Sequence, residues 1–188
     1  MRSLENPFHS LLKWLASVIL IALAACSCLQ ARADEKPDIK PPFGLQWEET
    51  SERMEKLLAG AKARIVDRHM VDDRQAWVVE GLVQQGLKRT VFYFKNDGLV
   101  EVELQYQDDS WDTQKYDDFM ASVRRKVEAR FGPGQLIARS KQPDGDVMQT
   151  VVGYKWTLNT TSIQLFYYSA EKGTNIFRTV SIHYRTNI

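Results

Sequence analysis

Cysteine is almost absent from this chain, which limits how the protein can be stabilised. Its two cysteines, Cys26 and Cys28, both lie near the N-terminus, so the rest of the chain forms no disulfide of its own. A disulfide-free body of about 155 residues depends on its apolar core, and a chain of that length buries roughly 68–70% of the surface that it exposes when unfolded. We therefore expect one domain held together by packing alone.

An excess of charge of one sign is also missing, since 25 Lys and Arg stand against 24 Asp and Glu. Nucleic-acid-binding domains carry a clear basic excess because they neutralise phosphates. The chain is 44% hydrophobic and 26% charged, which excludes an intrinsically disordered or collagen-like protein. This composition predicts a globular domain with no nucleic-acid partner.

No apolar run approaches the roughly 20 residues with which a helix spans a bilayer. Residues 14–25 are free of charge and have the length of a signal-peptide core. Cleavage at the lipobox-like residues 23–26 would leave an acylated Cys26 as a membrane anchor, whereas cleavage at the small-x-small site before Asp34 would leave a lipid-free protein. We predict that residues 1–33 are a signal peptide and that the protein is exported to the periplasm, with both processing routes open.

Prolines cluster where the folded domain is expected to begin. Residues 34–46 are polar and proline-rich, which disfavours helix and predicts an extended linker before a single domain at 47–188. Within this domain a pattern of one helix and four strands occurs twice. The pattern divides the domain into pseudo-repeats 47–109 and 110–188.

Each pseudo-repeat begins with the apolar spacing of an amphipathic helix. The first helix follows a capping Thr50 or Ser51 and ends near Gly60, and the second follows a capping Asp112 and ends near Phe131. The apolar stripe of the first helix consists of Met54, Leu57 and Leu58.

Runs rich in apolar and aromatic residues predict four strands after each helix. They span about 61–70, 75–83, 88–96 and 98–107 in the first pseudo-repeat, and 135–140, 147–158, 161–169 and 175–186 in the second. The sequence Asn96-Asp97-Gly98 predicts a tight hairpin, and Glu101 and Glu103 in the next strand are expected on a solvent-exposed face. The expected fold class is α+β, a mostly antiparallel sheet with both helices packed on one face.

The sequence FGLQWEETS at residues 43–51, with the short helix after it, resembles the opening of a broad group of small exported bacterial domains. The group includes the SmpA/OmlA-type outer-membrane assembly lipoproteins and the tandem-repeat β-lactamase inhibitor proteins, and the resemblance covers about 20 residues. Glu48 stands where the group usually has glycine, at a tight turn after Trp47. The resemblance implies a helix followed by a meander of strands and a cell-envelope setting, and it carries over no functional residue.

Sequence motifs for catalysis and metal binding are missing. The chain has no HExxH, CxxC, calcium-loop, P-loop or nucleophile-elbow pattern. His69 lies near Asp67, Asp72 and Asp73, and we interpret this segment as a solvated loop rather than a metal site. We therefore expect no catalytic residue, no bound metal and no cofactor.

Aromatic residues are plentiful on the expected strands, where consecutive side chains point to opposite faces. If Val91 and Tyr93 face the helices, their aromatic neighbours lie on the opposite, open face of the sheet. Aromatic side chains mixed with Arg and His are typical of a protein-binding surface. The alternative is that the rings pack against one another or under the N-terminal segment, with Trp47 as a covering residue. The predicted partner-binding residues are Phe92, Phe94, Phe166, Tyr168, His183 and Arg185.

These features favour a non-catalytic protein-binding or assembly module of the bacterial cell envelope, whose partner is another envelope protein or macromolecule. Membrane contact would come only through a lipid on Cys26. Two alternatives remain open. A carrier of a small apolar ligand needs an apolar cavity of a few hundred Å³. An enzyme needs a pocket in which His69 or His183 meets carboxylates with perturbed pKa values.

Overall fold

The computed structural model of the protein describes residues 38–187, which belong to the compact unit Asp38–Ile188. The predicted signal peptide, both cysteines and the first part of the predicted linker lie outside the described residues, so export and lipidation at Cys26 stay predictions. Inside the described range, no helix combines the length and apolarity that a membrane crossing requires.

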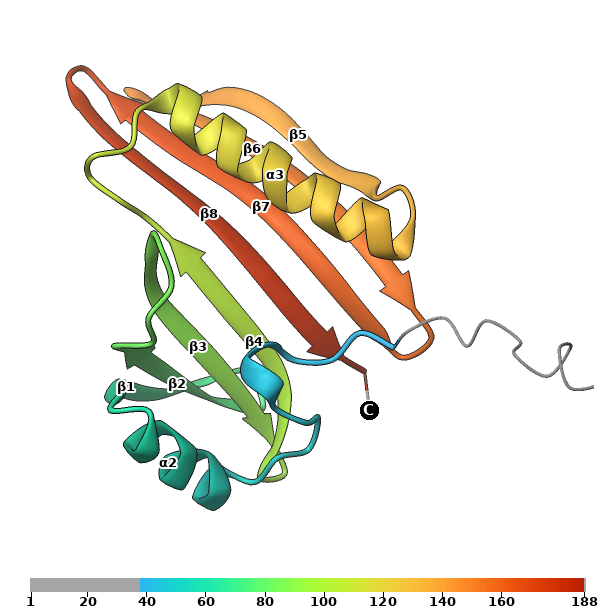
Figure 1. Ribbon diagram of the computed structural model, residues 1–188. Coiled ribbons are helices and arrows are strands. Elements are labelled where there is room, and N and C mark those ends of the chain that lie inside the picture. The colour runs from blue at the N-terminus through green and yellow to red at the C-terminus, as the bar shows by residue number, and fades with distance from the viewer. Residues whose placement is uncertain (1–37, 188) are drawn as a thin grey trace, which may run out of the picture. The chain divides into compact units, whose positions relative to one another are not determined.

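The fold is α+β with the helix-plus-four-strand pattern repeated, as predicted (Figure 1). The first pseudo-repeat contains the 3-10 turn η1 (Pro42–Gly44), helix α2 (Ser51–Gly60) and strands β1 (Arg64–Val71), β2 (Arg74–Glu80), β3 (Leu87–Lys95) and β4 (Gly98–Tyr106). The second contains helix α3 (Thr113–Phe131) and strands β5 (Gln135–Asp144), β6 (Val147–Leu158), β7 (Thr161–Lys172) and β8 (Asn175–Thr186). The eight strands form one open antiparallel sheet in the order β1-β2-β3-β4-β8-β7-β6-β5, so β4 and β8 join the two pseudo-repeats.

Both helices begin and end where the sequence predicts, because side chains and a glycine accommodate their terminal backbone groups. Thr50 Oγ1 accepts a hydrogen bond from the backbone N–H of Arg53 at the start of α2. The Asp112 carboxylate accepts from the backbone N–H of Lys115 at the start of α3. Gly132 follows α3 with φ of 82°, a conformation that glycine adopts easily and that ends the helix.

The hairpin between β3 and β4 also follows from its turn residues. Asn96 and Asp97 have φ values of 50° and 67°, which two-residue type I′ turns require at both central positions. The Asp97 carboxylate also accepts a hydrogen bond of 2.5 Å from the hydroxyl of Ser51. This contact ties the hairpin to the first residue of α2.

The tight turn after Trp47 is present although its central residue is not glycine. Glu48 has φ of 64°, and its backbone N–H donates to the carbonyl of Leu99 at 2.9 Å. A left-handed conformation costs a non-glycine residue roughly 1–2 kcal/mol. The turn is therefore held by the pairing of this segment with the start of β4, at the expense of local strain.

We expect Glu48→Gly to raise the free energy of unfolding by about 0.5–1 kcal/mol, since it relieves this strain and the greater freedom of unfolded glycine cancels part of the gain. Urea denaturation measures the change. Glu52→Gly, in the first turn of α2, is the matched control and should lower the free energy of unfolding by about 1 kcal/mol. A lower stability for Glu48→Gly would contradict strain at this turn.

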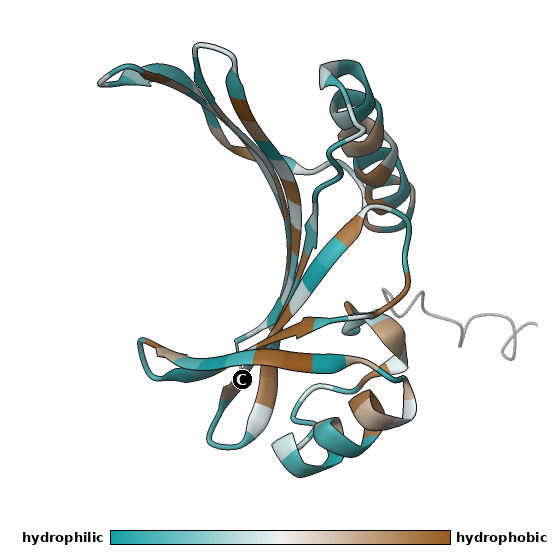
Figure 2. Ribbon diagram, turned by 90° about the vertical axis from the view of Figure 1, so that its left-hand side faces the viewer, coloured by the Kyte–Doolittle hydropathy of each residue, from teal (hydrophilic) through white to brown (hydrophobic). Residues whose placement is uncertain are grey.

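The core lies between the two helices and one face of the sheet. Its buried residues from the helices and sheet are Met54, Leu58, Trp77, Val79, Phe92, Phe94, Leu99, Val102, Leu104, Tyr106, Tyr116, Met120, Val127, Trp156, Ile163, Leu165, Tyr167, Val180 and Ile182. The sheet bends away from the helices, which lie on its convex side (Figure 2). Within residues 38–187 no helix covers the concave side, which we call the open face.

The segment before α2 packs into this core. Ile39 and Leu45 are buried in the core, and the indole N–H of Trp47 donates to the carbonyl of Ile39 at 2.9 Å. Asp38 accepts a hydrogen bond of 3.0 Å from the hydroxyl of Thr161 at the start of β7. Residues 38–46 of the predicted linker are thus a packed part of the fold, and Trp47 holds them on the helix side rather than covering the open face.

Candidate functional site

The open face carries side chains of three kinds from one edge towards the other. On β2 and β3 a small apolar cluster contains Ala76, Val78 and Val91, with Tyr93 packed against it. A network of charged and polar side chains follows on β4 and β8, where the two pseudo-repeats meet. Aromatic side chains of β7 and β8 lie beyond this network.

The prediction that Phe92 and Phe94 lie on the open face is wrong. Their side chains are 1% and 2% exposed in the core on the helix side, where Phe94 packs against Trp77 with ring centroids 4.7 Å apart. The intervening Tyr93 lies on the open face, where its hydroxyl donates to Glu103 at 2.8 Å. The Tyr93 hydroxyl thus has a carboxylate partner on the open face, whereas the two phenylalanine rings need no polar partner in the core.

The predicted placement of the remaining four residues agrees with the structure. Phe166, Tyr168, His183 and Arg185 alternate with buried core residues on β7 and β8 and are half-buried. The ring of Phe166 occupies the space above Gly153 that a side chain would fill, and it meets the His183 ring edge-on at 5.8 Å. The Tyr168 ring lies 6.0 Å from that of Phe177, an exposed aromatic that the sequence analysis did not select.

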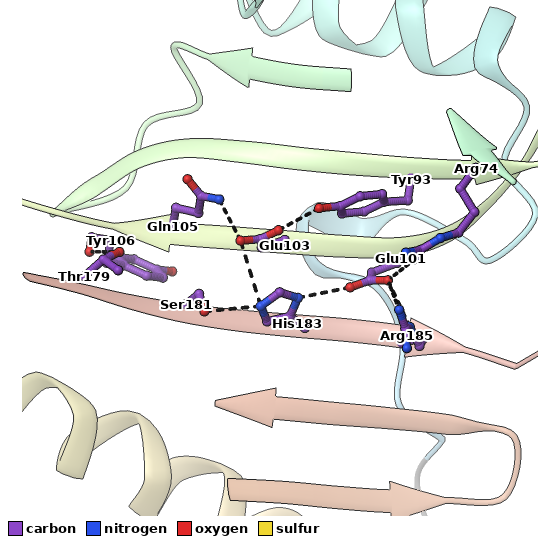
Figure 3. Close-up of polar contacts among 10 residues, drawn as sticks. All are labelled: Arg74, Tyr93, Glu101, Glu103, Gln105, Tyr106, Thr179, Ser181, His183 and Arg185. Atoms are coloured by element: carbon purple, nitrogen blue, oxygen red, sulfur yellow. Dashed lines mark hydrogen bonds and ion pairs between the residues drawn. The ribbon is translucent and has the colours of Figure 1, made fainter. Parts of the chain in front are cut away.

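Glu101 is the centre of the polar network (Figure 3). One of its oxygens accepts hydrogen bonds from Nε of Arg185, at 2.9 Å, and from Arg74 of β2, and it forms an ion pair with Nη2 of Arg185 at 2.7 Å. Its other oxygen lies 3.0 Å from Nδ1 of His183. Glu101 therefore joins side chains of β2, β4 and β8, and no pattern local to any one of these strands indicates that arrangement.

The electrostatics of Glu101 reflect this environment. Burial by itself would raise the pKa of its carboxyl, because the charged form loses water. The contacts with His183 and the charge of Arg185 outweigh burial and lower the pKa from its ordinary 4.5 to about 2. Glu101 is thus ionised at all physiological pH values.

Glu103 forms the second half of the network. One of its oxygens accepts from Gln105 at 2.6 Å, and the same oxygen lies 3.9 Å from Nε2 of His183. Burial, together with the neighbouring Glu103 charge, raises the pKa of the Tyr93 phenol well above its usual range. The expectation that Glu101 and Glu103 lie on a wet face is wrong, since they are only 4% and 9% exposed. Curvature of the sheet and cross-strand partners bury them.

Part of the network has the serine–histidine–carboxylate order of contacts by which some enzymes activate a serine nucleophile. His183 Nε2 lies 3.2 Å from the Ser181 hydroxyl, while Nδ1 of the same ring faces Glu101. Such an enzyme also needs donors for a developing oxyanion. The backbone around Ser181 is paired with strands on both sides, and the Glu103 carboxylate adds negative charge beside Nε2. The geometry thus meets the requirement that His183 contact a carboxylate of perturbed pKa, but it favours an internally paired surface over acyl transfer.

His69 lies on β1, in agreement with the strand predicted at about 61–70, and the interpretation of its segment as a loop is wrong. Its Nδ1 is 2.8 Å from the Asp67 carboxylate, and both side chains are well exposed. Among residues 38–187, no group of three or more His, Cys, Asp or Glu side chains is arranged to hold a metal ion.

A cavity of about 440 Å³ lies between α3 and the neighbouring strands on the convex side. Its apolar lining includes Met120 and Val152, and its rim carries charged side chains of α3 such as Asp117 and Arg125. The size suits a small ligand. A purely apolar ligand would remove water from the charged rim without replacing its hydrogen bonds, which disfavours binding of such a ligand.

Comparisons with protein-family models, with curated proteins and with solved structures gave no match to this chain.

Proposed function

We propose that this protein is an exported bacterial cell-envelope protein and a non-catalytic binding or assembly module, which binds a protein partner through its open face. One observation carries the proposal: a concave sheet face presents half-buried and exposed aromatic rings beside a polar network centred on Glu101. Aromatic anchors on a rigid support dominate the affinity of many protein interfaces.

The open face is large enough for a stable interface. Eight strands at about 4.8 Å spacing span roughly 34 Å, and 12-residue strands are roughly 40 Å long. A standard interface buries about 800 Å² on each partner. Part of this face is therefore sufficient to bind a folded protein.

The polar network supports binding by keeping the surface in one conformation. Glu101 immobilises the side chains of Arg74, His183 and Arg185, so less conformational entropy is lost when a partner docks. The ring of Phe166 is similarly constrained between Gly153 and His183. The envelope setting rests on the predicted signal peptide and lies outside the described structure.

Replacing Phe166 and Tyr168 together by alanine tests the proposal. Partners are first identified by crosslinking in intact envelopes and mass spectrometry, and binding is then measured with the purified partner. We expect the double variant to bind at least about 100-fold more weakly, since interface anchors each contribute roughly 2 kcal/mol or more. Circular dichroism should show an unchanged fold.

Phe43→Ala is the matched control, because this ring is 45% exposed but lies on the helix side. It should leave binding within about twofold of the wild type. Equal affinity of the wild type and the Phe166/Tyr168 double variant would rule out the open face as the binding site.

A further inference from the structure

One end of the open face contains a cavity with a positively charged lining. It has a volume of about 300 Å³ and is lined by Arg74, Lys95, Val100, Arg185, Thr186 and Asn187. The lining residues carry three positive charges and no negative charge, and they come from β2, β3, β4 and the end of β8. Cations from three separate strands thus converge on one space.

The buried carboxylate of Glu101 contacts two of these cations, Arg74 and Arg185, and fixes their orientation. Glu101 is not among the lining residues, and its side chain is only 6% exposed. It contacts Nη1 of Arg74 and one edge of the Arg185 guanidinium. A guanidinium has five N–H donors, and the contacts with Glu101 use only part of those on Arg74 and Arg185, which leaves donors for a ligand in the cavity.

The third cation, Lys95, forms an exposed ion pair with Asp73 that a bound ligand can replace. Its ammonium lies 2.6 Å from the Asp73 carboxylate, and both side chains are about half exposed or more, at 47% and 64%. Exposed pairs of this kind contribute little to stability. With Glu101 and Asp73 counted, the three cations retain an excess of one positive charge.

The charged cavity adjoins a larger one. The second cavity, of about 610 Å³, shares Lys95, Val100 and Asn187 with the first and continues along the β3–β4 turn to Thr50. The larger cavity is also lined by the carboxylates of Glu48 and Asp97, so the positive lining belongs to the smaller cavity.

We propose that the cavity lined by Arg74, Lys95 and Arg185 binds the carboxylate of an aspartate or glutamate side chain on the protein partner. This inference rests on the proposed function and specifies the chemistry of the partner: an acidic residue that anchors one end of the interface, with the aromatic residues of β7 and β8 at the other. Arginine forks and an exchangeable lysine suit a carboxylate in both shape and charge.

The test follows the Arg185 Nε–H signal of the purified protein by ¹H–¹⁵N NMR. The probe is an N-acetylated, C-terminally amidated hexapeptide Gly-Ser-Glu-Glu-Ser-Gly, whose carboxylates are all side-chain groups. We expect a saturable shift that weakens as salt is raised. Lys95→Gln and Arg185→Gln should each weaken peptide binding at least tenfold. Binding to both variants is followed on backbone amide signals, because the Arg185→Gln variant has no Arg185 Nε–H.

Arg89→Gln is the matched control, since it removes the same charge from an exposed residue of β3 outside this cavity. It should bind the peptide within twofold of the wild type. Three results would each overturn the assignment. The first is equal affinity for a Gly-Ser-Gln-Gln-Ser-Gly peptide, and the second is an equal loss of peptide affinity in all three variants. The third is a protein that binds inorganic phosphate but does not bind the acidic peptide. Because this assay needs no partner, its failure is separate from failure of the Phe166/Tyr168 experiment.

Discussion

Replacing Glu101 by glutamine should lower the free energy of unfolding by about 3 kcal/mol. The substitution keeps the shape of the side chain but removes the charge that faces Arg74, His183 and Arg185. Breaking a buried ion pair from one side leaves the opposite charges without compensation, which costs more than the pair contributes. Urea denaturation at pH 7 measures the loss.

The same variant should change how stability depends on pH. The pKa of Glu101 is lowered from 4.5 to about 2 in the folded protein, so the unfolded state binds more protons in this range. Its stabilising effect is complete above about pH 5 and is lost as the pH falls towards 2, a difference of about 3 kcal/mol. The gap between wild type and Glu101→Gln should therefore narrow steadily as the pH is lowered.

Glu52→Gln is the control, because Glu52 makes only an exposed pair with Lys56 on α2. It should change the free energy of unfolding by less than about 0.5 kcal/mol. A Glu101→Gln protein as stable as this control would mean that the network contributes nothing to folding. A stability gap that does not depend on pH would mean that the charge of Glu101 is not its source.

Gly134→Ala should destabilise the protein by about 2 kcal/mol, for a steric reason. A Cβ at this position would lie 2.5 Å from two ring carbons of Trp156. That ring is only 4% exposed, and its N–H donates to the carbonyl of Gly132 at 3.0 Å, so it cannot move aside without disturbing the core. Inserting a methyl group into a filled core costs roughly 1–3 kcal/mol. Urea or thermal denaturation provides the measurement.

Gly60→Ala separates this clash from the general effect of replacing glycine. Gly60 is the last residue of α2, and nothing lies within 4 Å of a Cβ added there. Alanine should raise the free energy of unfolding at this position by about 0.5–1 kcal/mol. If both variants shift stability in the same direction, the Trp156 clash is not the cause.

The secondary structure could be predicted from the sequence because its signals are local. Thr50 and Asp112 cap the helices, Asn96 and Asp97 form the predicted hairpin turn, and Gly132 ends α3. Each of these residues acts through its own conformation or on a backbone group a few positions away. The repeat of helix plus four strands follows from the same signals read twice.

The candidate site was predictable only in part. Alternation on β7 and β8 placed Phe166 and His183 on the open face correctly, because their neighbours are unambiguously apolar. On β3 every residue from 91 to 94 is apolar or aromatic, so alternation by itself could not choose a face. The choice depends on Trp77 and Glu103, which reach β3 from neighbouring strands.

The sequence by itself determined the class of fold, the order of its elements and the absence of a recognisable catalytic or metal-binding motif, since all of these depend on residues close together in the chain. Strand ends were less accurate, since β5 and β7 continue to Asp144 and Lys172, beyond the predicted 140 and 169. Only the tertiary structure decided which strand faces are buried, and only it brought Glu101 next to His183, 82 positions away. The physical reason is the pairing of β4 with β8, which joins the two pseudo-repeats. That pairing creates both the buried carboxylates and the cationic cavity from residues that no local pattern connects.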